Sequence, residues 1–186
     1  MLALYHADHS VCAQKVRLAL AEKGVAWESR FLDLMAGDQH KPEYRRINPD
    51  ALVPAIEHDG RVLMESTVIN EYLDDAFPDP PLRPGTPAAR GRMRLWTKRL
   101  DEGLHAAAGV VSFAVAFRHV RLRTETMAAI EASLEQVPDP VRRARQRDTI
   151  RNGVDSPYFA DAFRQFVRLF DDMEAEGLAR LRASFA

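Results

Sequence analysis

The chain has 186 residues, enough for one large domain or two small ones and for a sizeable core. Its formal net charge of −1 gives no basis for a nucleic acid or an anionic membrane as a bulk partner. A single cysteine excludes an intrachain disulfide and a metal site built from several cysteines. The N-terminus lacks a basic-then-apolar signal segment and no apolar run approaches a bilayer span, so we expect a cytoplasmic protein.

The first 24 residues predict a strand, a short polar turn and a helix. Residues 2–5 are apolar, and from Ser10 onward Val16 and Leu20 recur on one helical face until Gly24 stops the helix. The charged residues of this helix are expected to face mostly outward.

Ser10 and Cys12, the chain's only cysteine, fall in the first turn of this predicted helix. Unpaired backbone N–H groups and the helix dipole favour negative charge there. A thiolate at this point is therefore stabilised, whether it belongs to Cys12 or to a bound ligand. Two simpler interpretations stay open: Ser10 as an N-cap and Cys12 as a small buried apolar residue.

The next 55 or so residues complete a small mixed sheet. Residues 27–34 predict a second strand, and residues 35–48 predict a polar loop with at most a short helix. Two apolar runs flank Asp59-Gly60, a strong hairpin signal. Ser66 is then predicted as the N-cap of a helix that ends before Pro78. Its expected buried face holds Val68, Ile69, Tyr72, Leu73 and Ala76.

The second half of the chain predicts helices only. Five prolines in residues 78–87 indicate a stiff linker and a domain boundary. The apolar spacing beyond it predicts helices over residues 90–122, 124–134 and 158–184. The basic run at residues 142–147 is interpreted as a solvated helix face rather than a nucleic-acid patch. An apolar stripe on the last helix is expected in the core: Phe159, Phe163, Phe166, Phe170 and Met173.

Three motifs, in this order, resemble those of the cytosolic glutathione transferases. Residues 9–17 (HSVCAQKVR) resemble the Ser-x-Cys segment of zeta-class enzymes and of related reductive dehalogenases. Residues 48–55 (NPDALVPA) resemble the segment that presents backbone groups to glutathione, and residues 65–73 (ESTVINEYL) resemble the helix that holds its γ-glutamyl end. Short stretches such as RLWTK at residues 94–98 extend a resemblance to bacterial β-etherase-type transferases into the second domain.

The resemblance implies the glutathione transferase fold. An α/β thioredoxin-like N-terminal domain that binds glutathione would span residues 1–79, a proline-rich linker residues 80–88, and an all-α helical C-terminal domain residues 89–186. Family members usually carry a further buried helix after the equivalent of residues 163–174. We therefore expect either a shortened helical domain or a segment that is absent from this chain.

The resemblance also implies glutathione as co-substrate. The zeta-like motif places Ser10 and Cys12 as the catalytic candidates, with Ser10 favoured. The β-etherases have their serine at the position of Ala13, so their catalytic residue does not carry over.

The binding residues follow from the other two motifs. A cis Val53–Pro54 peptide would present backbone groups to the ligand, and Glu65 would be a buried acid facing its amine. His40 or Lys41 would meet the glycyl carboxylate, although for both residues an exposed loop role is equally open. The implied glutathione-binding residues are Gln39, His40, Val53, Pro54, Glu65 and Ser66.

The expected function is attack of the glutathione thiolate on a hydrophobic electrophile, with an aromatic compound favoured. One alternative is a Cys12-dependent thiol transferase or reductive dehalogenase, and another is a non-catalytic binding protein of the same fold. The family resemblance implies a homodimer, and no metal, nucleic acid or membrane partner is expected.

Overall fold

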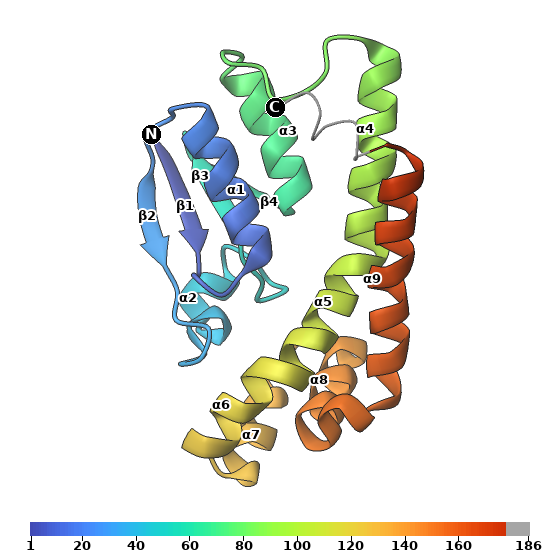
Figure 1. Cartoon of the computed structure of the whole chain (residues 1–186). Coiled ribbons are helices and arrows are strands. Elements are labelled where there is room, and N and C mark those ends of the chain that lie inside the picture. Colours follow the sequence, from blue (N-terminus) through green and yellow to red (C-terminus); the bar gives the residue numbers. More distant parts are fainter. Residues whose placement is uncertain (178–186) are drawn as a thin grey trace. The chain divides into compact units, whose positions relative to one another are not determined.

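The computed structural model describes residues 1–177, which form two compact units. The first unit holds residues 1–97 with 136–138, and the second holds residues 98–135 with those after 138. Figure 1 shows a sheet covered by helices in the first unit and helices alone in the second. The predicted end of the last helix, residues 178–184, lies outside the described residues.

The first unit is built on a four-stranded mixed sheet of order β2-β1-β3-β4. Strand β2 runs parallel to β1, whereas β3 is antiparallel to both β1 and β4. Asp59 and Gly60 join β3 to β4, each with a positive φ, as a tight two-residue hairpin requires. The predicted mixed sheet is confirmed, and its strands are β1 (Leu2–His6), β2 (Glu28–Phe31), β3 (Ala55–His58) and β4 (Arg61–Met64).

Two helices, α1 (Val11–Glu22) and α3 (Ser66–Ala76), complete the core of this unit. Three expectations for α3 are wrong. Val68, at 53% exposure, and Ala76 are exposed rather than buried. The N-cap position belongs to Glu65, so Ser66 is the first helical residue. The most deeply buried side chains of this core are Leu4, Val16, Leu20, Ile56, Ile69 and Leu73.

A buried ion pair ties the proline-rich linker to the first unit. Lys23 Nζ lies 2.6 Å from Asp74 Oδ1 and donates to the carbonyl oxygens of Phe77 (2.7 Å) and Pro80 (3.0 Å). Asp74 also accepts the N–H of Leu82 at 2.8 Å. The outward position expected for the charged residues of α1 is therefore wrong for Lys23, whose ammonium finds three acceptors inside the protein.

A continuous helix runs from Pro87 to Thr124. It consists of α4 (Pro87–Arg99), α5 (His105–Ser112) and α6 (Arg118–Thr124), joined by π-helical turns at residues 100–104 and 113–117. The helix contains an 18-residue window with a mean hydropathy of 1.3, long and apolar enough to cross a membrane by length and composition. The expectation that no run approaches a bilayer span is wrong by this criterion, which core helices of soluble proteins also meet.

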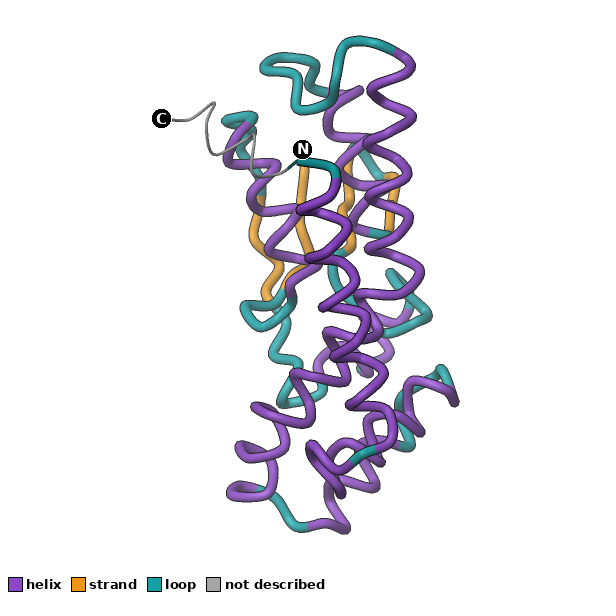
Figure 2. The backbone as a smooth tube through the Cα atoms, turned by 45° about the vertical axis from the view of Figure 1, so that its right-hand side comes forward, coloured by secondary structure: helices purple, strands orange, loops and turns teal. Residues whose placement is uncertain are grey.

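The rest of the described second unit is helical as well (Figure 2). It contains α7 (Met127–Leu134), α8 (Pro140–Asn152) and α9 (Pro157–Ala175). The basic run lies on α8, where arginines pair with carboxylates of α7. Arg147 Nε, for example, is 2.7 Å from Glu131, which favours helix pairing over a nucleic-acid surface.

Helix α9 packs against α5 through small residues. Ala107, Val110 and Ala162 are buried between them, with Phe166 against this cluster. The other side of α9 stays exposed: Phe163 is 56% and Phe170 58% exposed. The core position predicted for the whole aromatic stripe is therefore wrong for these two residues, because the described α9 has neighbours on only one side.

Candidate functional site

The connections that carry the predicted site residues meet at one edge of the sheet. Strands β1, β2 and β4 run in the same direction, so their carboxyl ends share this edge, where the antiparallel β3 begins. Tyr5 pairs with Ala55, which pairs with Met64, so these three residues lie in line across the sheet. Helices α1 and α3 both begin here, and two helix N-termini make this edge favourable for an anionic ligand.

Ser10 caps α1 at this edge. Its hydroxyl oxygen accepts the N–H of Ala13 at 3.2 Å, which is the usual N-cap bond. The hydroxyl in turn donates to the carbonyl oxygen of Val53 at 3.4 Å. The structure thus brings together two residues that lie 43 positions apart and that the sequence assigned to one site.

Cys12 is the second residue of α1, and its half-buried side chain forms no disulfide. Residues two apart on a helix point in different directions, so Cys12 and Ser10 do not share one face of α1.

The Val53–Pro54 peptide bond is cis, as predicted, and both residues are buried. The segment before it is held from inside the unit. The hydroxyl of Tyr44 and the amide of Asn48 both donate to the carbonyl oxygen of Leu52, Asn48 at 2.9 Å. Burial raises the pKa of Tyr44 well above its usual range, so its hydroxyl stays a neutral donor.

The start of α3 supplies the next pair of candidate residues. Ser66 is buried, with 6% exposure, in the first turn of the helix. Glu65 precedes it with φ +66°, a backbone conformation uncommon for a residue with a side chain, and it is exposed. The buried position expected for the Glu65 carboxylate is therefore wrong. Lys15 of α1 donates to Thr67 at 2.7 Å and so links the two helices near this edge.

Gln39 and His40 lie in a short 3-10 helix after β2, Asp38–His40, which is followed by α2 (Pro42–Arg45). Both residues are half-buried. The Gln39 amide nitrogen donates to the Leu34 carbonyl oxygen at 3.3 Å. Its Oε1 is buried and accepts no hydrogen bond from the described residues, an acceptor that suits a donor on a ligand.

A polar cluster at the turn before Ser10 was not predicted from the sequence. His6, Asp8 and Arg17 are joined by hydrogen bonds at the turn between β1 and α1. Arg17 follows Ser10 by two helical turns, so their common face was the available signal. Among the described residues no group of three or more His, Cys, Asp or Glu side chains is placed to hold a metal ion.

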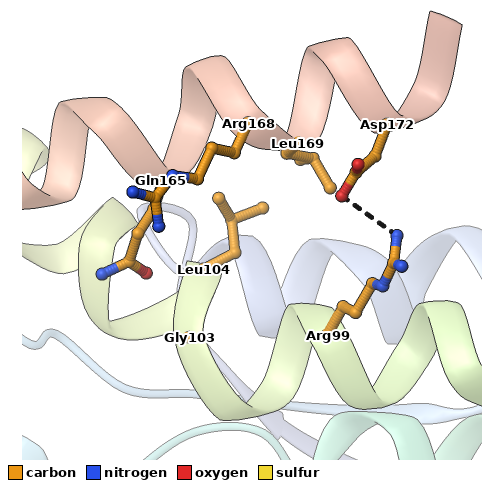
Figure 3. Close-up of a pocket in the computed structure, with 7 residues that line it drawn as sticks. All are labelled: Arg99, Gly103, Leu104, Gln165, Arg168, Leu169 and Asp172. Atoms are coloured by element: carbon orange, nitrogen blue, oxygen red, sulfur yellow. Dashed lines mark hydrogen bonds and ion pairs between the residues drawn. The ribbon is translucent and has the colours of Figure 1, made fainter. Parts of the chain in front are cut away.

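The second unit contains a separate cavity of about 240 Å³ (Figure 3). Arg99 and Asp172 form an ion pair of 3.1 Å at one end of it, and Gly103 lies on its opposite wall from Arg168. None of the predicted site residues lines this cavity. It is lined by Arg99, Gly103, Leu104, Gln165, Arg168, Leu169 and Asp172.

Comparison with known proteins identifies the family. A family model described as glutathione S-transferase, N-terminal domain, matches residues 4–81. Protein LigF of Sphingobium sp. (strain NBRC 103272 / SYK-6) is 34% identical over 166 residues, 88% of this chain and 64% of LigF. The crystal structure of the beta-etherase LigF superposes with a TM-score of 0.78, over 88% of this chain and 68% of that one. The chain belongs to the cytosolic glutathione transferase family.

Other relatives match mainly a part of the chain. A probable maleylacetoacetate isomerase of Caenorhabditis elegans is 42% identical over 101 residues, 54% of this chain and 47% of that protein. A stringent starvation protein A homolog of Pasteurella multocida is 36% identical over 102 residues, 55% of this chain and 47% of that one. The chain thus spans 64% of LigF and about half of these relatives. The thioredoxin-like first unit and the helical second unit confirm the predicted fold.

Proposed function

We propose that this transferase binds glutathione at the sheet edge described above and directs its thiolate at a hydrophobic electrophile. The observation that carries the proposal is the contact of 3.4 Å between the Ser10 hydroxyl and the Val53 carbonyl oxygen, at the N-terminus of α1. A serine donor and a backbone strand that can pair with a peptide are thereby placed side by side. The proposed domains are residues 1–79 for glutathione, a linker at 80–88 and a helical domain from residue 89.

The binding roles follow from the chemistry of the edge. The first turn of α3, with Ser66, would receive the γ-glutamyl carboxylate, and exposed Glu65 would receive the amine beside it. Backbone groups of Val53 and Pro54 would pair with the cysteinyl part. Gln39 and His40 would meet the glycyl end, where Gln39 Oε1, which accepts no hydrogen bond from the described residues, would accept the N–H of the glycyl peptide group.

The reaction needs a thiolate near neutral pH. The Ser10 oxygen accepts the Ala13 N–H, and its O–H donates to the Val53 carbonyl oxygen. When glutathione binds, the O–H would donate to the ligand sulfur in place of this carbonyl oxygen. A free cysteine thiol has a pKa of about 8.5, and a donor at a helix N-terminus lowers the thiol pKa by stabilising the anion. The thiol proton leaves to solvent, the sulfur–carbon bond forms, and the bond from that carbon to its leaving group breaks with its electron pair.

The class of electrophile is proposed from the relatives. LigF is a beta-etherase, and this relative favours an aromatic compound such as an aryl ether as the electrophile. We further propose a cytoplasmic homodimer, as is usual for the family. The half-buried thiol of Cys12 in the first turn of α1 supports a second candidate, a thiol transferase or reductive dehalogenase. In it the Cys12 thiolate attacks the glutathione sulfur of a glutathionylated substrate, a mixed disulfide of Cys12 with glutathione forms, and the substrate leaves with the electron pair of the broken bond.

Two alanine variants test which residue carries the chemistry. Ser10→Ala should lower transfer to an aromatic electrophile by about 10- to 100-fold, corresponding to roughly 1.5–3 kcal/mol for a hydrogen bond to a charged group. It should also raise the pKa of bound glutathione, measured from thiolate absorbance in the ultraviolet. Cys12→Ala is the matched control and should change little. Full activity in Ser10→Ala beside an inactive Cys12→Ala would assign the reaction to Cys12.

Retention on immobilised glutathione separates an enzyme from a non-catalytic protein of the same fold. The wild-type chain should be retained and eluted by free glutathione, and Ser66→Ala should weaken retention. A chain that passes through unretained, with no transfer activity, would favour a binding protein.

A further inference from the structure

The turn between β1 and α1 is held by side chains that the proposed reaction does not use. Arg17 Nη1 lies 3.1 Å from His6 Nδ1 and donates to Asp8 Oδ1 at 3.0 Å. Gln14 Nε2 donates to the backbone oxygen of Asp8 at 3.2 Å. Two side chains of α1 thus reach back to the turn that immediately precedes Ser10.

His6 is the buried end of this network, with 6% exposure. A guanidinium can only donate, so Nδ1 is the acceptor for Arg17 and the ring proton is assigned to Nε2. That proton is donated to Ser29 Oγ on β2 at 2.8 Å. The ring also packs against Trp27, with centroids 5.3 Å apart, and against Phe31 at 5.8 Å.

The neutral ring is the form that the surroundings favour. Burial lowers the pKa of His6, the positive charge of Arg17 lowers it further, and Asp8 opposes these effects. The other neighbours of the ring, Ser29, Trp27 and Phe31, are uncharged. Protonation would place a donor at Nδ1 against the Arg17 donor and so break the bond between them.

We propose that Arg17 is a positioning residue for Ser10, an inference that rests on the proposed function. The backbone passes from strand β1, which ends at His6, to helix α1, which Ser10 caps, through one short turn. Arg17 ties both the start of that turn and its middle to the second turn of the helix that follows. These bonds hold the Ser10 hydroxyl in a fixed position next to the Val53 carbonyl oxygen. The glutathione sulfur would replace this carbonyl oxygen as the acceptor of the Ser10 hydrogen bond.

A merely stabilising role is the alternative. The Asp8 side chain is 69% exposed, and an exposed ion pair contributes little to folding. If Arg17 only stabilised the fold, its removal would change kcat, the KM and the thermal unfolding midpoint together. If Arg17 positions Ser10, its removal should lower kcat, and it should do so only in a chain that still contains Ser10.

The experiment is a double-mutant cycle on kcat and on the KM for glutathione. Arg17→Met should lower kcat by about 10-fold, because a small misplacement of a reacting group is costly, and leave the KM within about twofold. In the Ser10→Ala background the same change should alter kcat by less than about twofold, since nothing remains to be positioned. Arg30→Met is the matched control: it removes one positive charge and an ion pair with Glu28 from β2 and should leave kcat unchanged.

A second measurement follows the network without any reaction. The chain has two tryptophans, so a Trp96→Phe background leaves Trp27 as the only indole beside His6. Its fluorescence should report protonation of His6 with a midpoint below about 6.5, the ordinary histidine value. Arg17→Met should move this midpoint upward, because the charge that disfavours the imidazolium is lost.

The proposal is supported by a loss of kcat that depends on Ser10 together with a raised midpoint. It is overturned if kcat is unchanged, if it falls equally with and without Ser10, or if the KM and the thermal midpoint fall in parallel with it. Arg17→Lys serves if the methionine variant does not fold, and its kcat should be intermediate because the ammonium still donates to Asp8. Full activity of Ser10→Ala alone would instead refute the proposed function, and the Trp27 titration would still test the network.

Discussion

Lys23 and Asp74 form an ion pair whose side chains are almost inaccessible, 0% and 5% exposed. Without Lys23, the buried Asp74 carboxylate keeps Arg83 at 3.1 Å and the Leu82 N–H but loses its most deeply buried cation. Lys23→Met should therefore lower the free energy of unfolding by about 3–5 kcal/mol, measured by urea denaturation. Lys98→Met is the control, because its partner Glu102 lies one turn away on the same exposed helix face, and it should cost less than about 0.5 kcal/mol. Similar losses for the two variants would contradict the role given to burial.

Asp74 also makes stability depend on pH. Burial alone would raise its pKa, but the hydrogen bonds from Lys23 and from the Leu82 N–H outweigh it and hold the pKa below its usual range. The unfolded carboxyl therefore takes up a proton first as the pH falls through about 3.9, and the stabilisation is lost from there downward. Asp74→Asn should flatten the fall in unfolding free energy between about pH 5 and pH 3. An unchanged slope would show that other carboxylates control acid unfolding.

Single residues were predicted best where a motif fixes the backbone around them. Ser10 and Val53 are in contact as expected, because Ser10 follows strand β1 and Val53 precedes strand β3. These two strands are antiparallel neighbours in the sheet, so the end of one lies beside the start of the other. Glu65 was expected to be buried, but it is exposed, since the charge of a helix-start carboxylate is solvated unless a ligand covers it. The bonds of Arg17 could not be predicted, because hydrogen bonds of a long side chain depend on geometry that no motif encodes.

At the scale of elements, α9 offers a comparison within one helix. Phe166 packs against the buried cluster of α5 and α9, whereas Phe163 is 56% exposed. Phe166→Ala should cost about 2–4 kcal/mol of unfolding free energy, and Phe163→Gln should cost less than about 1 kcal/mol. Urea denaturation of both variants checks this. A large loss in Phe163→Gln would mean that its exposed face is covered in solution.

Apolar periodicity predicted which segments are helices and which are strands. It did not predict irregular turns within a helix or which face of a helix is covered. Every predicted strand and each of the predicted helices is present over the described residues, with ends shifted by a few positions. The π-helical turns at residues 100–104 and 113–117 were not predicted, because one extra residue in a turn barely changes the apolar spacing. The stripe on α9 was placed in the core for a related reason: periodicity finds an apolar face but not what covers it.

At the scale of the whole molecule, the proposed homodimer predicts a mass of about twice the 21.0 kDa of one chain. Light scattering at micromolar concentration measures it directly. The physical reason to expect a dimer is exposed apolar surface, such as the exposed face of α9, because large apolar surfaces are commonly buried in protein–protein contacts. A single species with the mass of one chain would contradict this proposal. It would not affect the proposed glutathione site, whose candidate residues all lie in the first unit.

The linker between Phe77 and α4 is anchored at both ends. Lys23 and Asp74 hold its first half, and Arg90 donates to the carbonyl oxygens of Pro84 and Gly85 in its second half, the latter at 2.8 Å. Most linkers accept insertions and deletions because few bonds cross them. Here a residue gained or lost would pull one anchor away from its partners, so the number of residues in this stretch is itself under structural constraint.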